Sequence, residues 1–410
     1  MRYTEQTAMK IFFSVGEPSG DLHGANLIRA LKQRDRNLEC VGYGGPKMAA
    51  AGGDLHEDLT QLAVMFFLQA ILNIHKFYAL LKRADRYFAE HHPDAVVLID
   101  YPGFNWWIAR KAKRHGIPVF YYGAPQMWAW AGWRVKKMKR LVDHVLCKLP
   151  FEAEWYRERG CNAHYVGHPY FDELQNQQLD SAFLNEYAAD PRPLVTILAG
   201  SRTQEVANNL ESFLQAAARI QQQVPHVRFA VASFSDAHAR TARDMIAAGD
   251  VDADVFVGRT AELIHLASCC LACSGSVSLE LLFHTKPSVI LYAVPRWGHL
   301  LTTTFLIKVK YITLVNLLAC DDRFDGVAGY FDPHAEGADQ VPMPEYLTYE
   351  DKTEQLASHI VHWLSSADSY QSRQAYLAEL KQTLAHGGAS QTAANYMLNT
   401  LGAPSVRQAA

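Results

Sequence analysis

Asp100 is placed where a carboxylate could take part in catalysis. It directly follows the apolar run 95–99. Ligands of α/β proteins bind at the carboxyl ends of buried strands, and burial there can raise the pKa of a carboxyl group enough to make it a general base. The alternative is a structural Asp that caps the helix after the strand. Asp100 is therefore a candidate catalytic base.

The turn Gly200-Ser201-Arg202 could bind an anion. It ends the apolar run 194–198 and begins a long helical pattern. Its backbone N–H groups, its hydroxyl and its guanidinium could all contact a diphosphate. An ordinary helix cap with a surface Arg is the alternative. Its place at the carboxyl end of a strand favours anion binding.

Two further strand-to-helix turns are rich in small residues. Residues 16–21 could bring N–H groups close to an anion or could form only a tight turn. Their spacing does not match G-x-G-x-x-G, so no dinucleotide site is indicated. The second turn, Ser274-Gly275-Ser276, precedes Glu280. A carboxylate there could accept both hydroxyls of a ribose.

Metal, redox and serine-hydrolase sites are not indicated. Cys270 and Cys273 form a C-x-x-C pair inside an apolar run, so we expect buried structural cysteines. The D-x-D spacing at 252–254 precedes a strand, away from the expected ligand-binding edge. The 18 His show no H-E-x-x-H spacing, and no G-x-S-x-G elbow occurs. We expect no metal and no cofactor.

The elements that position these residues are short apolar runs alternating with amphipathic stretches. This order predicts parallel sheets covered by helices on both faces. The expected strands are 11–15, 95–99, 119–122, 144–147, 194–198, 227–232, 255–257, 269–273 and 287–293. We expect an α/β protein with two Rossmann-like domains, 1–172 and 190–350, facing a central cleft. C-terminal helices at about 365–402 can pack back on the first domain.

Composition narrows the class of protein. The chain has 410 residues, 39 Lys+Arg and 42 Asp+Glu, with a formal net charge of −3. This balance argues against a chain-wide nucleic-acid surface. Seven Cys do not make a disulfide scaffold and indicate a reduced, cytosolic protein. Residues 1–10 lack the apolar core of a signal peptide, so secretion is not expected.

Two segments could contact a membrane. Residues 62–81 are mostly apolar, but Gln69, Asn73 and Lys76 form a polar stripe at helical spacing. The stripe argues against a spanning helix and leaves a buried helix or one lying in a membrane surface. The second segment joins the tryptophans of 128–133 to the basic run 134–140. This combination suits an anionic membrane, single-stranded nucleic acid or a solvated helix face.

Taken in order, these segments resemble the lipid-A-disaccharide synthases, inverting glycosyltransferases of the GT-B fold. The resemblance runs from Ile11 to about Ala319 and depends on the order of the motifs more than on any one of them. The matching stretches are Gly16-Glu17-Pro18-Ser19-Gly20-Asp21 with Leu27–Leu31, Gly45-Pro46-Lys47-Met48, Leu62-Ala63-Val64-Met65, Ile99-Asp100 with Pro102 and Phe104-Asn105, Trp128-Ala129-Trp130, Leu149-Pro150-Phe151-Glu152, Gly167-His168, Gly200-Ser201-Arg202 with Glu205-Val206, Ser274-Gly275 with Leu279-Glu280, and Asn316-Leu317-Leu318-Ala319.

The resemblance implies a reaction and a site. The donor would be UDP-2,3-diacylglucosamine, the acceptor 2,3-diacylglucosamine 1-phosphate, and the products a β-1,6-linked disaccharide phosphate and UDP. Asp100 would deprotonate the acceptor 6-hydroxyl, and Arg202 would neutralise the departing diphosphate, which an Arg and helix N-termini can stabilise without a metal. The implied substrate-binding residues are Gly200, Ser201, Glu205, Ser274, Gly275, Ser276, Glu280 and Asn316, with Glu17, Ser19, Gly20 and Asp21 lining the cleft from the other domain.

The resemblance also implies partners and a location. The two candidate membrane segments would contact anionic inner-membrane lipid and acyl chains. The protein would be cytoplasmic and peripheral on the inner membrane, with no nucleic-acid partner. A homodimer stays open.

The chain departs from the family's pattern at several positions. Phe66 and Gln69 replace Gly and Glu, Gly103 replaces Asp, Val315 replaces Pro, Ser276 replaces Thr, and Cys320-Asp321-Asp322 replaces Gly-Arg-Glu. These changes concern substrate detail more than reaction class, because Asp100 and Arg202 are retained. Two alternatives stay open: another UDP-sugar GT-B enzyme, with a different lipid acceptor or a 2-epimerase activity, and a catalytically silent lipid- or nucleotide-binding homologue.

Overall fold

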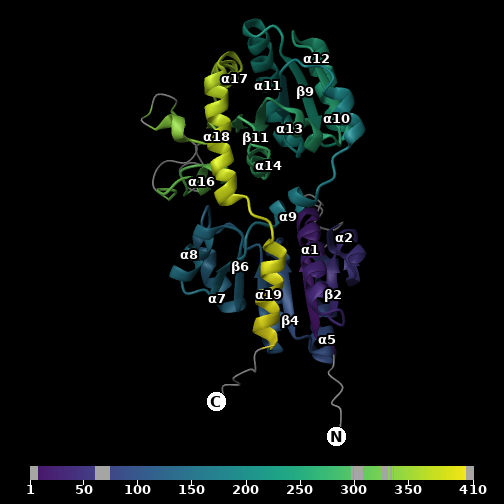
Figure 1. Cartoon of the computed structure of the whole chain (residues 1–410). Coiled ribbons are helices and arrows are strands. Elements are labelled where there is room, and N and C mark those ends of the chain that lie inside the picture. The colour runs from purple at the N-terminus through teal and green to yellow at the C-terminus, as the bar shows by residue number, and fades with distance from the viewer. Residues whose placement is uncertain are drawn as a thin grey trace. The chain divides into compact units, whose positions relative to one another are not determined.

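The computed structural model describes residues 8–60, 74–296, 299, 308–324, 331–332, 335 and 337–402. The chain forms two compact units (Figure 1). The first unit contains Met1–Gln175 and His386–Ala410, and the second contains Asn176–Ala385.

The first unit is built on a parallel sheet in the order β3-β2-β1-β4-β5-β6-β7. The strands are β1 (Lys10–Val15), β2 (Glu39–Gly44), β3 (Asp54–Asp58), β4 (Ala95–Ile99), β5 (Val119–Tyr122), β6 (His144–Cys147) and β7 (Ala163–Tyr165). The strand order reverses between the neighbours β1 and β4. At such a switch point the loops leaving two adjacent strands diverge and open a space for ligand.

Helices cover this sheet, and one of them comes from the far end of the sequence. They are α1 (Pro18–Arg34), α2 (Pro46–Ala50), α5 (Ile74–His91), α6 (Pro102–Arg114), η1 (Gly132–Arg134), α7 (Val135–Leu141), α8 (Pro150–Glu158), α9 (Pro169–Asn176) and α19 (Ala389–Gly402). Helix α19 packs beside α1 (Figure 1). Its Ala393, Ala394 and Met397 join the same apolar core as Ile11 and Phe13 of β1.

Asp172 fixes the start of α19. Its carboxylate accepts hydrogen bonds from the backbone N–H groups of Gly388, Ala389 and Ser390, at 2.5, 3.0 and 2.8 Å. The first N–H groups of a helix have no partner within the helix, so a carboxylate there satisfies them. Of the C-terminal helices expected to pack back on the first domain, α19 belongs to the first unit, and α18 (Ala367–Leu384) belongs to the second.

The second unit repeats the architecture with a parallel sheet in the order β10-β9-β8-β11-β12-β13. Its strands are β8 (Leu194–Leu198), β9 (Arg228–Ser233), β10 (Ala253–Val257), β11 (Cys269–Cys273), β12 (Ser288–Ala293) and β13 (Glu345–Thr348). Its other helices are α10 (Ser181–Tyr187), α11 (Thr203–Gln223), α12 (Asp236–Ala248), α13 (Thr260–Leu266), α14 (Val277–Phe283), α16 (Leu314–Leu318), η3 (Ala338–Gln340) and α17 (Thr353–Ser365). The switch point lies between β8 and β11.

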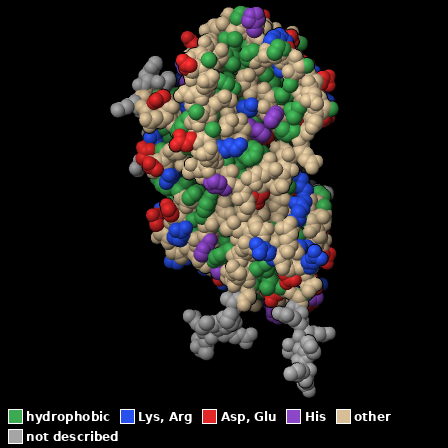
Figure 2. All heavy atoms as spheres, in the orientation of Figure 1, with side chains coloured by type: hydrophobic (Ala, Val, Ile, Leu, Met, Phe, Trp, Pro, Cys, Tyr) green, Lys and Arg blue, Asp and Glu red, His purple; other side chains and the backbone are tan. Residues whose placement is uncertain are grey.

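The predicted pair of parallel α/β sheets is confirmed. Most of the predicted apolar runs form buried strands. Because helices cover both faces of a parallel sheet, its strands are apolar on both faces. Most of the first predicted membrane segment, including Phe66 and Gln69, lies outside the described residues. Among the helices that the structure describes, none is long and apolar enough to cross a bilayer. On the face shown in Figure 2, basic and acidic side chains are interspersed.

Candidate active site

Asp100 leaves the sheet of the first unit at its switch point. It follows β4, directly beside β1, and both Asp100 and Tyr101 have left-handed backbones with φ of 48° and 42°. Such conformations are costly for residues other than Gly and cluster at functional sites. A Cβ on Gly20 would lie 3.1 Å from Oδ2 of Asp100. The carboxylate of Asp100 therefore lies against the first turn of α1. This turn contains Gly20 of the segment 16–21.

Buried polar groups hold this backbone in place. The carbonyl oxygen of Asp100 accepts hydrogen bonds from Nδ2 of Asn105 and from the hydroxyl of Tyr121, both at 2.7 Å. Asn105 also accepts a hydrogen bond from the hydroxyl of Ser14 at 2.6 Å, so it links the ends of β1 and β4. The N-cap of α6 is Tyr101, so Asp100 is not the capping residue of that helix.

The residues of the 16–21 turn have different surroundings. Glu17 and Ser19 are exposed, whereas Gly20 is buried. The carboxylate of Asp21 is buried and accepts hydrogen bonds from the N–H groups of Gly45, Lys47 and Met48 at 2.9–3.0 Å. It thus caps α2. Its geometry supports a structural role in shaping the turn.

In the second unit, Arg202 lies in a turn that already holds an anion, the carboxylate of Glu205. Oε2 of Glu205 accepts the N–H groups of Ser201 and Arg202 at 3.0 and 3.1 Å. Oε1 accepts a hydrogen bond from Nη1 of Arg202 at 2.6 Å. Gly200 has a φ of 120°, and a Cβ there would lie 2.5 Å from that of Glu205, so only Gly fits. The Arg202 side chain is 79% exposed and can reach a ligand.

The Ser274-Gly275-Ser276 turn follows β11, the neighbour of β8, so both predicted anion-binding turns leave adjacent strands. Gly275 and Ser276 are exposed, whereas Glu280 is buried one turn into α14. The hydroxyl of Ser274 donates to the carbonyl oxygen of Ile312 at 3.4 Å. The turn is therefore tied to a loop that comes later in the sequence.

Asn316 is 1% exposed, and its side-chain amide is engaged within the protein. Nδ2 donates to the Met343 carbonyl oxygen at 2.7 Å and to Oε2 of Glu345 at 2.9 Å, while Oδ1 accepts the Met343 N–H at 3.0 Å. The amide can make these three bonds without a ligand. The amide thus joins α16 to Met343 and Glu345, and the predicted contact between Asn316 and the nucleotide stays a prediction.

Other predicted features have structural places. Cys270 and Cys273 are free and buried in β11, and burial raises the pKa of both thiols to about 12. Asp254 accepts a hydrogen bond from Tyr187 at 2.7 Å. Among the described residues, no three His, Cys, Asp or Glu side chains are grouped to hold a metal.

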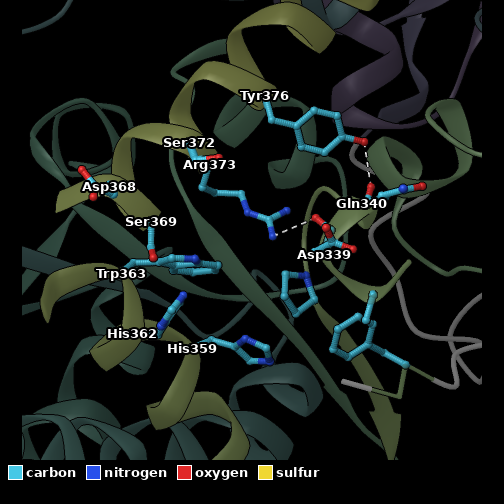
Figure 3. A pocket seen from close by; sticks show the side chains of 13 residues that line it. Asp339, Gln340, His359, His362, Trp363, Asp368, Ser369, Ser372, Arg373 and Tyr376 are labelled. Carbon is cyan, nitrogen blue, oxygen red and sulfur yellow. Dashed lines mark hydrogen bonds between the residues drawn. The ribbon is translucent and has the colours of Figure 1, made fainter. Parts of the chain in front are cut away.

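A cavity of about 810 Å³ lies in the second unit, between η3, α17 and α18 (Figure 3). Trp363 and Tyr376 flank the guanidinium of Arg373, which donates to the carbonyl oxygens of Asp339 and Val341. None of the predicted site residues lines this cavity. The hydrogen bonds of Arg373 join the chain before β13 to α18.

Sequence reasoning did not identify Asn105, Tyr121 or Glu345. Asn105 stood in a matched motif without a role. Glu345 is a lone acidic residue in the otherwise apolar stretch 341–347, which is the one feature that could have marked it. Its hydrogen-bond partners lie about 30 residues away in the sequence, so no local pattern reveals them.

Two sheets of this kind, each with its candidate residues at the switch point, define the class of protein as GT-B. Solved structures share the fold: a UDP-GlcNAc 2-epimerase from Neisseria meningitidis (TM-score 0.62, 12% identity, covering 95% of this chain and 100% of that one), and the calicheamicin glycosyltransferase CalG4 (TM-score 0.56, 13% identity, covering 98% and 100%). At these identities the likeness shows the fold alone.

The chain belongs to the lipid-A-disaccharide synthetase family, whose model matches residues 11–378. Lipid-A-disaccharide synthase from Geobacter sulfurreducens is 30% identical over 400 residues, covering 97% of this chain and 99% of that one. The enzyme of the same name from Coxiella burnetii (strain Dugway 5J108-111) is 32% identical over 397 residues, covering 95% and 98%. The predicted family and the predicted function, a glycosyltransferase that forms the lipid A disaccharide, are confirmed.

Proposed function

We propose that the chain transfers 2,3-diacylglucosamine from UDP-2,3-diacylglucosamine to 2,3-diacylglucosamine 1-phosphate. Asp100 is the general base and Arg202 binds the diphosphate. The observation that carries the proposal is the position of the candidate residues. Each follows a strand at the switch point of its sheet: Asp100 in the first unit, and the two predicted anion-binding turns in the second.

Asp100 is suited to positioning the acceptor. Its backbone is fixed by Asn105 and Tyr121, and its carboxylate lies against Gly20, where no side chain intervenes. In the reaction, Asp100 takes the proton from the acceptor 6-hydroxyl while the oxygen forms a bond to the anomeric carbon of the donor. The bond from that carbon to the phosphate oxygen breaks, and UDP leaves with its electron pair. A base held in fixed geometry lowers the entropic cost of this step.

Arg202 is suited to the departing charge. Its guanidinium and the Ser201 and Arg202 N–H groups converge on Glu205 at the start of α11, a helix of 21 residues. A diphosphate presents the same kind of oxygen acceptors and more negative charge. Donor binding therefore transfers Arg202 from Glu205 to the diphosphate, while Glu205 keeps the turn in shape.

The nucleotide lies over the Ser274-Gly275-Ser276 turn, and Glu280 accepts from the ribose hydroxyls. Adjacent strands carry this turn and that of Arg202, which suits a ligand with a diphosphate next to a ribose. The fold is compatible with such a ligand, since the Neisseria meningitidis epimerase was solved bound to UDP-GlcNAc and the S. aureus protein MnaA with UDP.

An aromatic and basic surface of the first unit contacts anionic lipid. Trp130 and Trp133 are 49% and 77% exposed, and the Arg134 guanidinium lies 5.5 Å from the Trp130 ring centroid. Trp107 is also exposed, and the guanidinium of Arg110 lies 4.8 Å from its ring centroid. Exposed tryptophans beside cations suit the headgroup region of a membrane, where the acylated substrates reside. We place the protein on the cytoplasmic face of the inner membrane.

Product analysis tests the proposed reaction. Purified protein is given UDP-2,3-diacylglucosamine and 2,3-diacylglucosamine 1-phosphate with EDTA present, and the products are identified by mass spectrometry. A disaccharide phosphate and one equivalent of UDP are expected. Donor epimerised without acceptor, or donor left intact by protein that binds UDP, would contradict the proposal.

A further inference from the structure

The edge strand of the second sheet begins with a fully buried acidic residue, Glu345. Its Oε1 accepts the N–H of Ile312 at 2.7 Å, and its Oε2 accepts the N–H of Thr313 at 3.0 Å and Nδ2 of Asn316 at 2.9 Å. A buried carboxylate is costly unless its oxygens receive hydrogen bonds. All three hydrogen-bond donors belong to the segment 312–316. The carboxylate of Glu345 therefore binds a single loop.

That loop contacts the proposed nucleotide site. The carbonyl oxygen of Ile312 belongs to the same peptide group as the Thr313 N–H that Glu345 binds, and it accepts a hydrogen bond from the hydroxyl of Ser274. Helix α16, which contains Asn316, packs against α14, which contains Glu280. Ser274 and the helix that contains Glu280 therefore both contact structure that Glu345 holds.

Glu345 is itself firmly anchored. The strand β13 pairs with β12, and the adjoining Pro344 carbonyl accepts the N–H of Ile290 at 2.8 Å. On the other side, Arg373 of α18 donates to the carbonyl oxygens of Val341 and Pro342. The sheet and α18 thus set the position of the Glu345 carboxylate. The position of the 312–316 loop depends in turn on that carboxylate.

We propose that Glu345 is a positioning residue of the donor site: through its hydrogen bonds to Ile312, Thr313 and Asn316 it holds the loop that fixes Ser274, and so sets the affinity for the UDP moiety. The inference rests on the proposed nucleotide site. It assigns to Asn316 the same supporting role, since its side-chain amide joins α16 to the backbone of Met343 and to the carboxylate of Glu345.

Binding of UDP by isothermal titration calorimetry tests this inference in E345Q and E345A. Loss of three hydrogen bonds to the segment 312–316 should weaken UDP binding by about tenfold in E345A. The loss should be smaller in E345Q, which keeps one acceptor oxygen and the packing. The donor KM should rise in parallel while kcat stays within about twofold of wild type, because Asp100 and the acceptor site lie in the first unit.

The matched control is E262Q. Glu262 is also buried in the second unit, but it accepts from the Asp180 N–H and pairs with Arg259, not with the 312–316 loop. E262Q should bind UDP as wild type does. Equal UDP affinity in wild type, E345Q and E345A, with folding verified by circular dichroism, would overturn the inference.

Two measurements separate this inference from the proposed nucleotide site. If E280A and R202A bind UDP as tightly as wild type, the nucleotide site itself is wrong. If those variants lose affinity and the Glu345 variants do not, only the role of Glu345 fails. Should the Glu345 variants not fold, hydrogen–deuterium exchange of wild type decides: UDP should slow exchange in the peptide 308–319, and unchanged exchange would overturn the inference.

Discussion

The guanidinium of Arg202 and the carboxylate of Glu205 form a 2.6 Å hydrogen bond at the start of α11, where a diphosphate would bind. The same carboxylate accepts two backbone N–H groups of the turn. Glu205 therefore has two opposing effects on an incoming anion. It shapes the turn, and its negative charge competes for the donors.

The variant E205Q separates these effects. The amide keeps one acceptor oxygen and the packing against Gly200, but it loses the charge. We expect UDP to bind about threefold more tightly at low ionic strength, with the free energy of unfolding lowered by about 1 kcal/mol through the weaker cap. Calorimetry at two salt concentrations measures the first effect and denaturant unfolding the second. Weaker UDP binding by E205Q would show that shaping the turn outweighs competition.

Arg202 should tolerate no substitution, not even by Lys. R202A should weaken UDP binding by about 10- to 100-fold, and R202K should fall between R202A and wild type, because an ammonium supplies charge without the planar fork. R192A is the control, since Arg192 is half-exposed in the same unit and pairs with Asp190. Calorimetry with UDP measures all three. Wild-type affinity in R202A would remove this residue from the site.

Glu345 gives the stability of the protein a specific pH dependence. Burial raises the pKa of its carboxyl group from 4.5 to about 7. The folded state therefore holds the proton more tightly than the unfolded state, and the resulting stabilisation is complete below pH 4.5 and lost as the pH rises through 7. Tyr311, next to Ile312, has a raised pKa, and Lys310 is paired with Asp322. Burial lowers the pKa of His359, beside Tyr346, from 6.5 to about 4, so His359 adds stability as the pH rises from 4 to 6.5. That contribution is common to wild type and a Glu345 variant and cancels when the two are compared.

E345Q should lack this dependence. The difference in unfolding free energy between wild type and E345Q should shift in favour of E345Q between pH 5 and pH 8, by at most about 3 kcal/mol. Denaturant unfolding of both proteins at pH 5, 6.5 and 8 measures it. Parallel stability profiles for the two proteins would show that Glu345 keeps one protonation state throughout.

The exposed side chains of Trp130 and Trp133 should be needed for lipid binding and not for folding. The double variant W130A/W133A should sediment at least about fivefold less with anionic vesicles than wild type, because both indoles are exposed. F234A is the control, since Phe234 is 71% exposed but lies in the second unit. Equal sedimentation of W130A/W133A and wild type would move the lipid contact elsewhere.

The sequence predicted the positions of Asp100 and Arg202 because each follows an apolar run, and parallel strands share the edge at which they end. It did not identify four strands: β2, β7, the edge strand β3 with the polar sequence Asp-Leu-His-Glu-Asp, and β13, which follows a long irregular connection. β3 lacks the apolar pattern because only part of its surface is covered, whereas the buried strand β13 begins with the acidic residue Glu345.

The supporting contacts of the site depend on tertiary structure. Asp21 caps α2 through residues 24–27 positions later, a role that its local sequence does not reveal. Asn316 was expected to contact the nucleotide, yet its partners lie 27 and 29 positions away. Residue type and local spacing cannot distinguish a ligand-binding polar group from one that a distant backbone segment satisfies.

We propose that Asp100 acts on the acceptor proton and not on the nucleotide. Turnover and UDP affinity are measured together in D100A and in D94A, whose carboxylate lies at the opposite end of β4 and accepts the N–H of Lys10. D100A should lose turnover by about 1000-fold or more while its UDP affinity stays within twofold of wild type, and D94A should keep both. Wild-type turnover in D100A would contradict the assignment of Asp100 as the base and the proposed reaction mechanism.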